Sequence, residues 1–182
     1  MSPMSKGRLI AAAAVGVLAG LALGRTGQVA AKAKMLLHGD WEGQLKAEHR
    51  TVRRLLKAMA ETDVGEAPKR ASLLAEVADA ITRHAVEEEN VIYPALRAAG
   101  AGEAVKGLLA DHAAMKTMIR RLEESSLEDP DWLAKAKVLK ALVYRHVREE
   151  ERNLFPLLHD NGDHDENHKL TKLVRREGAR VA

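Results

Sequence analysis

Two eleven-residue stretches of the chain, 62 positions apart, carry the same pattern of residues. Residues 84–94 read HAVEEENVIYP and residues 146–156 read HVREEERNLFP, so a histidine, three glutamates, an aromatic residue and a proline fall at the same offsets. Upstream, Glu48-His49 is matched by Asp111-His112, 63 positions later. The second half of this body therefore repeats the first, which predicts a fold with approximate twofold symmetry.

Apolar residues around these stretches recur every three or four positions, which is the period of an amphipathic α-helix. The chain is dominated by Ala, Leu, Glu, Lys and Arg and has only 3% aromatic residues, a composition that favours helices over strands. Turn signals divide the body into four blocks, at about 40–60, 68–94, 103–124 and 129–156. We therefore expect an all-α fold, an antiparallel four-helix bundle of up-down-up-down order with a pseudo-twofold repeat.

Acidic residues and prolines give the expected ends of these helices. Asp40 is a suitable N-cap for the first helix, and Asp129 and Pro130 are expected as the N-cap and first residue of the fourth. Pro94 and Pro156 are expected to break the second and fourth helices, because proline lacks the backbone N–H that continues the hydrogen-bond ladder.

Ahead of the body lies an apolar segment, residues 9–24, which contains no charged residue. As a helix it would be roughly 24 Å long, shorter than a hydrocarbon core of about 30 Å, so a full membrane span is marginal. Gly16, Gly20 and Gly24 repeat on one face, a pattern that allows a homo-oligomer of closely packed helices. Three interpretations stay open: a membrane anchor, a cleaved signal peptide, and a peripheral or soluble helix that self-associates.

We expect three regions in the chain. Residues 1–39 hold the Ala/Gly-rich apolar helix and a linker that includes His38, and residues 40–160 form the helical bundle. Residues 161–182 form a tail with a short amphipathic helix at about 165–177, packed on the outside. The expected location is the bacterial inner membrane or the cytoplasm, and an exported form is less favoured.

The distribution of charge argues against a nucleic-acid partner. Residues 1–40 carry a net charge of +4, whereas the rest of the chain has 24 basic and 25 acidic residues, a net of −1. A basic cluster between Lys169 and Arg180 has no aromatic residues with which bases could stack. The chain has no cysteine, which excludes disulfides, thiolate metal ligands and a cysteine nucleophile.

Six polar residues fall within the apolar stripes of the four expected helices. Leu45, His49 and Val52 follow steps of four and three, so this histidine lies on the buried face of the first helix. In the second and fourth helices, a histidine and a glutamate four positions apart share the inward face. The core-facing candidates are His49, His84, Glu88, His112, His146 and Glu150.

A dinuclear metal centre accounts for all six. Imidazoles and carboxylates without partners are costly to bury, and four imidazoles exceed what two carboxylates can readily pair. Two metal ions, each with two imidazoles and with the carboxylates bridging between them, would compensate the whole set. Because nitrogen and oxygen ligands without sulfur suit iron, manganese or zinc, we expect two iron ions, with manganese or zinc less favoured.

The order and spacing of these residues resemble the hemerythrin-like family, also called the HHE cation-binding domain. The pattern covers residues 41–160 and consists of His49, His84-x-x-x-Glu88, His112 and His146-x-x-x-Glu150, followed by Tyr-Pro and Phe-Pro. The resemblance implies a four-helix bundle with a non-haem di-iron site, in which an oxo bridge can join the ions. Members of this family carry or sense oxygen, handle iron, or react with peroxide or nitric oxide.

One position departs from the oxygen-carrying members, which have a fifth histidine four residues after the histidine of the third helix. Lys116 stands at that position here. We therefore expect two more nearly equivalent ions with open positions, which favours turnover or iron handling over reversible oxygen transport. An additional oxygen ligand could come from Glu87, Glu149, Tyr93 or Tyr144, although a packing or solvent-facing role is favoured for each.

A second group of histidines follows Pro156. His159, His164 and His168 lie among acidic residues, and we expect them in a solvated polar turn rather than at a metal site.

Three functions stay open at this point. The first is a redox-active di-iron protein; if it is an enzyme, it is an oxidoreductase acting on peroxide, O₂ or nitric oxide. The second is an iron or oxygen sensor, or a membrane-tethered interaction module, that works without turnover. The third is a structural bundle without metal.

Overall fold

The computed structural model describes residues 39–181, and every regular element in this part is helical. The elements are α2 (Trp41–Ala60), α3 (Ala67–Glu87), η1 (Glu88–Ile92), α4 (Tyr93–Ala98), α5 (Gly102–Glu123), α6 (Trp132–Glu149), η2 (Glu150–Leu154), α7 (Phe155–Asn161) and α8 (His164–Gly178). The predicted all-α class is therefore confirmed for the described residues. The expected N-terminal helix with Gly16, Gly20 and Gly24 lies outside them.

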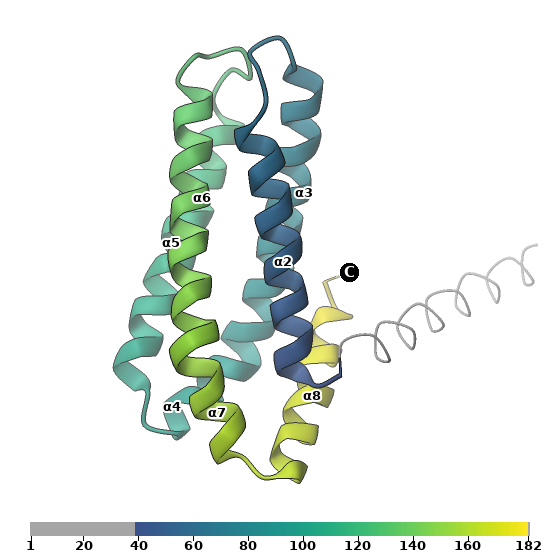
Figure 1. Ribbon diagram of the computed structural model, residues 1–182, viewed down its shortest axis with the longest axis vertical. Helices are drawn as coiled ribbons and strands as arrows, with labels where there is room; N and C mark the ends of the chain where they lie inside the picture. The colour runs from purple at the N-terminus through teal and green to yellow at the C-terminus, as the bar shows by residue number, and fades with distance from the viewer. Residues whose placement is uncertain (1–38, 182) are drawn as a thin grey trace, which may run out of the picture. The chain divides into compact units, whose positions relative to one another are not determined.

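Four long helices lie side by side in Figure 1, in one compact unit that begins at Asp40. Helix α2 packs against α3 and α6, and α5 packs against α6 and α3, so their contacts close a ring around the core. The short helices α4 and α7 lie at the lower end of this view, and α8 packs against α2, α3 and η1. None of the helices that the structure describes is long and apolar enough to cross a membrane.

Two helix starts follow from side-chain caps. Asp40 accepts a hydrogen bond from the Gly43 N–H at 3.0 Å and caps α2, as predicted. The fourth long helix begins at Trp132, three residues later than the predicted cap. Asp129 instead accepts a hydrogen bond from the Asp131 N–H at 2.8 Å, so it stabilises a turn ahead of α6 rather than the helix itself.

The predicted breaks at Pro94 and Pro156 are wrong. The chain continues through π-helical segments, η1 and η2, in which Tyr93 and Phe155 donate their backbone N–H groups to Glu88 and Glu150, five residues earlier. The wider turn places each proline at the start of the following α-helix, where its missing N–H is tolerated. Each π segment begins at one of the predicted glutamate ligands.

The hydrophobic core is divided into two clusters with a polar layer between them. One cluster lies toward the α2–α3 and α5–α6 connections and includes Leu56, Val77 and Trp132. The other includes Trp41, Ile92 and Phe155 and is covered in part by α8. The histidine positions of the four long helices fall between the two clusters, so the site is enclosed by apolar packing on both sides.

Candidate metal centre

The structure brings all six predicted residues together in the interior. They form two groups of four that share both glutamates, and all members of each group are buried. Each long helix supplies one histidine, and each π segment supplies one glutamate as its first residue. The first group is His49, His84, Glu88 and Glu150; the second is His112, His146, Glu88 and Glu150.

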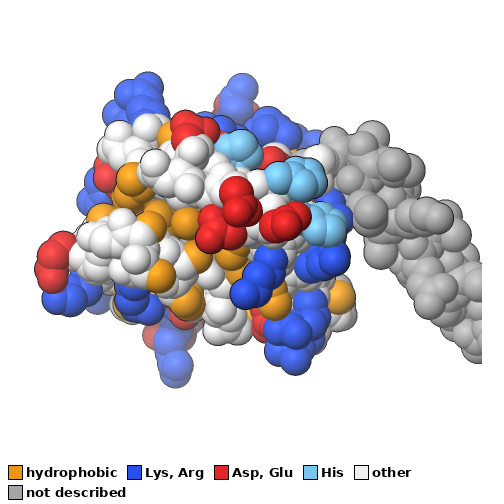
Figure 2. Space-filling model, turned by 90° about the horizontal axis from the view of Figure 1, so that it is seen from below, with side chains coloured by type: hydrophobic (Ala, Val, Ile, Leu, Met, Phe, Trp, Pro, Cys, Tyr) orange, Lys and Arg blue, Asp and Glu red, His pale blue; other side chains and the backbone are white. Residues whose placement is uncertain are grey.

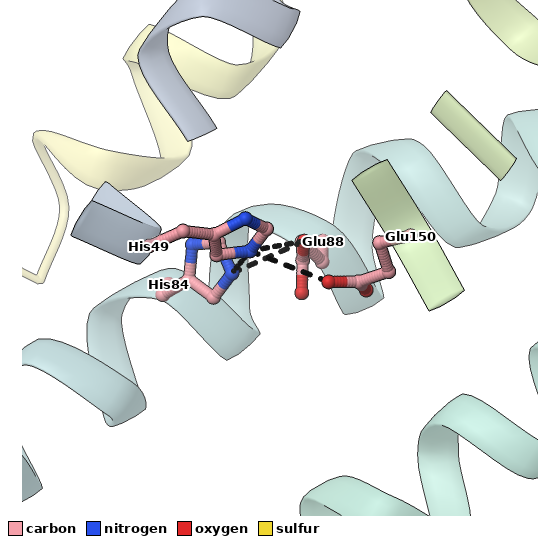
Figure 3. Close-up of side chains that lie close together, drawn as sticks. All are labelled: His49, His84, Glu88 and Glu150. Carbon is pink, nitrogen blue, oxygen red and sulfur yellow. Dashed lines mark hydrogen bonds and ion pairs between the residues drawn. The ribbon is translucent and has the colours of Figure 1, made fainter. Parts of the chain in front are cut away.

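In the first group the two histidines and the two glutamates point toward one another (Figure 3). The Nε2 atoms of His49 and His84 are 2.8 Å apart. His84 Nε2 lies 3.1 Å from Glu88 Oε1, and His49 Nε2 lies 3.3 Å from Glu150 Oε2.

The second group has the same arrangement. The Nε2 atoms of His112 and His146 are 3.1 Å apart. His112 Nε2 lies 3.4 Å from Glu88 Oε2, and His146 Nε2 lies 3.2 Å from Glu150 Oε1. Each carboxylate therefore presents one oxygen to each group, which is the placement that a bridging carboxylate requires.

These donor atoms fit two cations better than they fit one another. Two ligand atoms bound at about 2.1 Å and at right angles lie about 3.0 Å apart, close to the separations in both groups. Glu88 Oε1 and Glu150 Oε2 are buried and have no hydrogen-bond partner. A cation in each group would satisfy carboxylate oxygens that protein contacts leave without a hydrogen bond.

In the metal-free cluster the neighbouring carboxylates raise the pKa of two histidines, His84 and His112. Burial lowers the pKa of His84, but the Glu88 and Glu48 carboxylates outweigh it and hold this pKa well above its ordinary value. The pKa of His112 is raised in the same way, against burial, by Glu88 and Glu89. Burial raises the pKa of Glu88, yet His84 and His112 bring it well below its usual range. A metal ion would have to displace the protons on these imidazoles.

Carboxylates outside the cluster hold three of the histidine rings. The Nδ1 atom of His49 lies 2.9 Å from Glu151, that of His84 lies 3.1 Å from Glu48, and that of His112 lies 2.9 Å from Glu89. Such bonds place the proton on Nδ1 and leave Nε2 as the metal-binding atom. These three glutamates were not predicted from the sequence, although the repeat could have identified two of them, because Glu89 and Glu151 follow the ligands Glu88 and Glu150 directly.

The fourth ring, that of His146, lacks such a hydrogen bond. His146 Nδ1 is buried without a hydrogen-bond partner, and the nearest oxygen of Asp111 is 3.7 Å away. The other oxygen of Asp111 accepts a short hydrogen bond from Arg145. The two halves of the repeat therefore differ, since Glu48 reaches His84 whereas the shorter Asp111 is engaged by an arginine.

Of the four residues considered as additional oxygen ligands, Tyr93 is the one that lies in the cluster. Its Oη donates to Glu150 Oε1 at 2.8 Å and lies 3.2 Å from His112 Nε2. Burial, together with the charges of Glu88 and Glu150, raises the pKa of this phenol, so it stays protonated. In the other half of the repeat Phe155 stacks on His49, and no hydroxyl is present there.

The other three candidates lie elsewhere. Glu87 is buried against Gln44, whose side chain donates to it at 2.9 Å. Glu149 accepts a hydrogen bond from Asn153 on the surface, and Tyr144 lies 3.5 Å from the Arg53 carbonyl.

Lys116 occupies the position of the fifth histidine without reaching the cluster. Its side chain is half exposed, and its Nζ lies 2.9 Å from Glu89 Oε1. The same oxygen accepts from His112 Nδ1. Lys116 and His112 therefore share one oxygen of Glu89 as their partner.

The second group of histidines is helical, which corrects the expected polar turn. His159 lies on α7, and His164 and His168 lie on α8, because Asp163 and Glu166 form a capping box that starts this helix directly. His159 Nε2 lies 3.0 Å from Asp40. Figure 2 shows histidine and acidic side chains next to one another on the lower face. Neither metal-compatible group of the described residues includes these three histidines.

Comparisons with known proteins agree with the pattern of the site. The family model of the hemerythrin HHE cation binding domain matches residues 43–158. The fold is similar to the crystal structure of a hemerythrin HHE cation binding domain-containing protein from Mycobacterium kansasii, with a TM-score of 0.65 and 23% identity over 78% of this chain and 85% of that chain. A DNA nickase from Nostoc sp. is 30% identical over 81 residues, which are 44% of this chain and 23% of that protein, so the match spans under a quarter of the relative's length.

Proposed function

Since the chain belongs to the hemerythrin HHE cation-binding family, we propose that it is a non-haem di-iron protein that reacts with O₂, peroxide or nitric oxide. The observation that carries the proposal is the pair of buried groups, each with two imidazole nitrogens and oxygens from two shared carboxylates. Two iron ions in this set would together supply two electrons to a small oxidant. In this proposal α2, α3, α5 and α6 alternate in direction, because short connections favour antiparallel neighbours.

A small cavity supports a small reactant. Apolar side chains and the four histidine rings enclose about 20 Å³, lined by His49, Val52, Ile81, His84, His112, Met115, Val143, His146 and Val147. A space of this size is close to the minimum that holds one water molecule. A space of this size favours a reactant of one or two heavy atoms over an organic substrate.

The chain's own residues would manage protons and water around the reactant. Tyr93 Oη donates a hydrogen bond to Glu150 Oε1 at 2.8 Å, and the same hydroxyl could donate a hydrogen bond to a bound reactant. The apolar clusters on both sides limit the entry of water, which strengthens electrostatic interactions within the site.

Turnover is favoured over reversible oxygen transport. Lys116 binds Glu89 where oxygen-carrying members of the family have a histidine, so each ion has two imidazole ligands from this set. With fewer protein ligands, each ion would have more coordination positions at which a reactant could bind. Iron handling or sensing without turnover stays the alternative.

The test is the reaction of the iron-loaded protein. We would load the full chain with Fe²⁺ without air, add O₂, hydrogen peroxide or nitric oxide separately, and follow the near-ultraviolet and visible spectrum and the consumption of each reactant. We expect new absorption with at least one reactant and repeated consumption when a reductant is supplied. A single stoichiometric reaction would favour sensing, and an unchanged spectrum of the iron-loaded protein would contradict the proposal.

A further inference from the structure

A groove of about 510 Å³ lies between α5 and the α6–η2 segment, which run side by side in Figure 1. The wall on α5 is formed by small or apolar side chains, among them Ala104, Gly107 and Leu108. The opposite wall carries three arginines, Arg145, Arg148 and Arg152. A volume of this size is in the range of small-molecule sites.

Positive charge in this groove is only partly balanced. Arg145 donates to Asp111, but Arg148 and Arg152 make no ion pair within residues 39–181. The remaining carboxylate of the wall, Glu149, accepts a hydrogen bond from Asn153. Guanidinium groups that converge on a concave surface attract anions, and their planar N–H pairs match the oxygens of a phosphate or sulfate group.

The groove also reaches the outer side of the metal centre. Asp111 lines it and lies 3.7 Å from His146 Nδ1, which is buried and has no hydrogen-bond partner. The corresponding contacts of His49, His84 and His112 are 2.9 to 3.1 Å. The histidine whose outer nitrogen is unsatisfied is thus the one whose carboxylate neighbour is held by an arginine of the groove.

We propose that this groove binds a tetrahedral oxyanion, free phosphate or the phosphate group of a small molecule, between Arg148 and Arg152. The bound anion also attracts Arg145, which releases Asp111 to accept a hydrogen bond from His146 Nδ1. Occupancy of the groove is in this way coupled to one ligand of the metal centre.

The binding site is tested by calorimetric titration of the metal-loaded full chain with inorganic phosphate and, separately, glycerol 3-phosphate. We expect saturable binding that Arg148→Gln and Arg152→Gln each weaken at least about 10-fold, because each removes a charge-assisted hydrogen bond. The matched control is Arg121→Gln, which removes the same charge from an exposed position outside the groove. The ligand that binds more tightly shows whether the groove prefers free phosphate or the phosphate group of a small molecule.

Two results would overturn this site. Binding that persists in the Arg148→Gln/Arg152→Gln double variant would place the anion elsewhere, for instance on the metal ions. An equal loss of phosphate affinity in Arg121→Gln would show that the effect comes from the net charge of the protein and not from this groove. Metal content is measured in every variant, so a failure of this site is distinguishable from a failure of the proposed di-iron function.

The coupling rests on the proposed metal function and has its own readout. Affinity for Co²⁺ is measured with sodium sulfate and with sodium chloride at equal ionic strength. Because a hydrogen bond to the outer nitrogen of a metal-bound histidine changes metal affinity about 10-fold or more, sulfate is expected to tighten Co²⁺ binding by about that factor. Arg145→Gln should give the tighter affinity without sulfate, and an equal affinity in both salts for the unaltered protein would contradict the coupling.

Discussion

Glu88 and Glu150 each turn one carboxylate oxygen toward each pair of histidines, at 3.1 to 3.4 Å from the nearest Nε2 atoms. Both are fully buried, and each has one oxygen without a hydrogen-bond partner. A side chain in this environment is costly to the fold unless a cation binds it. The two residues that are best placed to bridge a pair of cations are therefore also the ones that destabilise the fold when no cation is bound.

Substitution of these glutamates should affect metal binding in a graded way. Glu88→Gln removes a charged ligand from both groups and should weaken metal binding by more than the 10- to 100-fold typical of an outer carboxylate. Glu89→Gln, which loses the acceptor for His112 Nδ1, should fall within about that range. Glu123→Gln, at an exposed position near the end of α5 and outside both the cluster and the groove, is the matched control and should leave metal binding unchanged in an equilibrium titration. Equal losses in all three variants would contradict this assignment.

Metal affinity should rise with pH. The carboxylates of Glu88 and Glu48 raise the pKa of His84 well above 6.5, against burial, so a proton stabilises the metal-free fold below about pH 6.5. That stabilisation is lost as the pH rises through the raised pKa, where the deprotonated imidazole becomes available to metal. Metal-dependent protection in thermal unfolding should therefore grow from pH 6.5 upward, and protection that shrinks over this interval would contradict the competition between proton and metal.

The histidines and glutamates of the centre could be predicted from the sequence because each replaces an apolar residue in a helical stripe. His49, His84, His112 and His146 are all buried as expected. The difference in how the outer nitrogens are held, with Glu48 bonded to His84 but Asp111 engaged by Arg145 and 3.7 Å from His146, could not be predicted in this way. That difference depends on which way a side chain turns within the core, and no periodicity reports it.

At the scale of elements, the π segments show that a proline in a helical pattern does not always end the helix. Pro94 and Pro156 follow η1 and η2 and begin α4 and α7, so the chain turns without ending the bundle helix. The first residue of each π segment is a glutamate of the metal centre. Insertions of this kind often occur at functional sites because they re-aim side chains. Proline alone marks a missing N–H, and it does not distinguish a helix end from a wider turn.

The docking of α8 on α3 gives a test at this scale. A Cβ atom at Gly178 would overlap the buried Glu87 carboxylate, so Gly178→Ala should destabilise the protein by about 1–3 kcal/mol. Gly107 lies exposed inside α5, and no atom lies close to the position that a Cβ atom would take there, so Gly107→Ala should stabilise the protein by about 0.5–1 kcal/mol. Urea denaturation measures both effects, and the same sign for the two variants would contradict the packing of α8.

In the compact unit as a whole, the cluster of histidines and glutamates draws on all four long helices. Each of α2, α3, α5 and α6 contributes one histidine to it, and the two π segments contribute the glutamates. The apolar clusters on both sides hold the helices together without metal, whereas the polar layer between them depends on compensation of its charge. If the proposed cations bind there, they would compensate this polar layer and stabilise the four helices together.

Removal of metal should therefore lower stability. A ligand present at 100 times its dissociation constant stabilises a fold by about 2.7 kcal/mol, so a chelator should lower the thermal midpoint by several degrees. The double variant His84→Leu/His146→Leu should lose metal binding and become insensitive to the chelator, because it removes one imidazole from each of the two groups. An identical thermal midpoint of the unaltered protein with and without chelator would favour a structural bundle without metal.

The most direct test of the central claim is an equilibrium titration of the purified chain with Fe²⁺ in the absence of air, with the bound iron counted per chain. The two groups of shared ligands predict two tightly bound ions per chain and their loss in the His84→Leu/His146→Leu variant. Fewer than one tightly bound ion, or two ions that remain in this variant, would contradict the dinuclear centre.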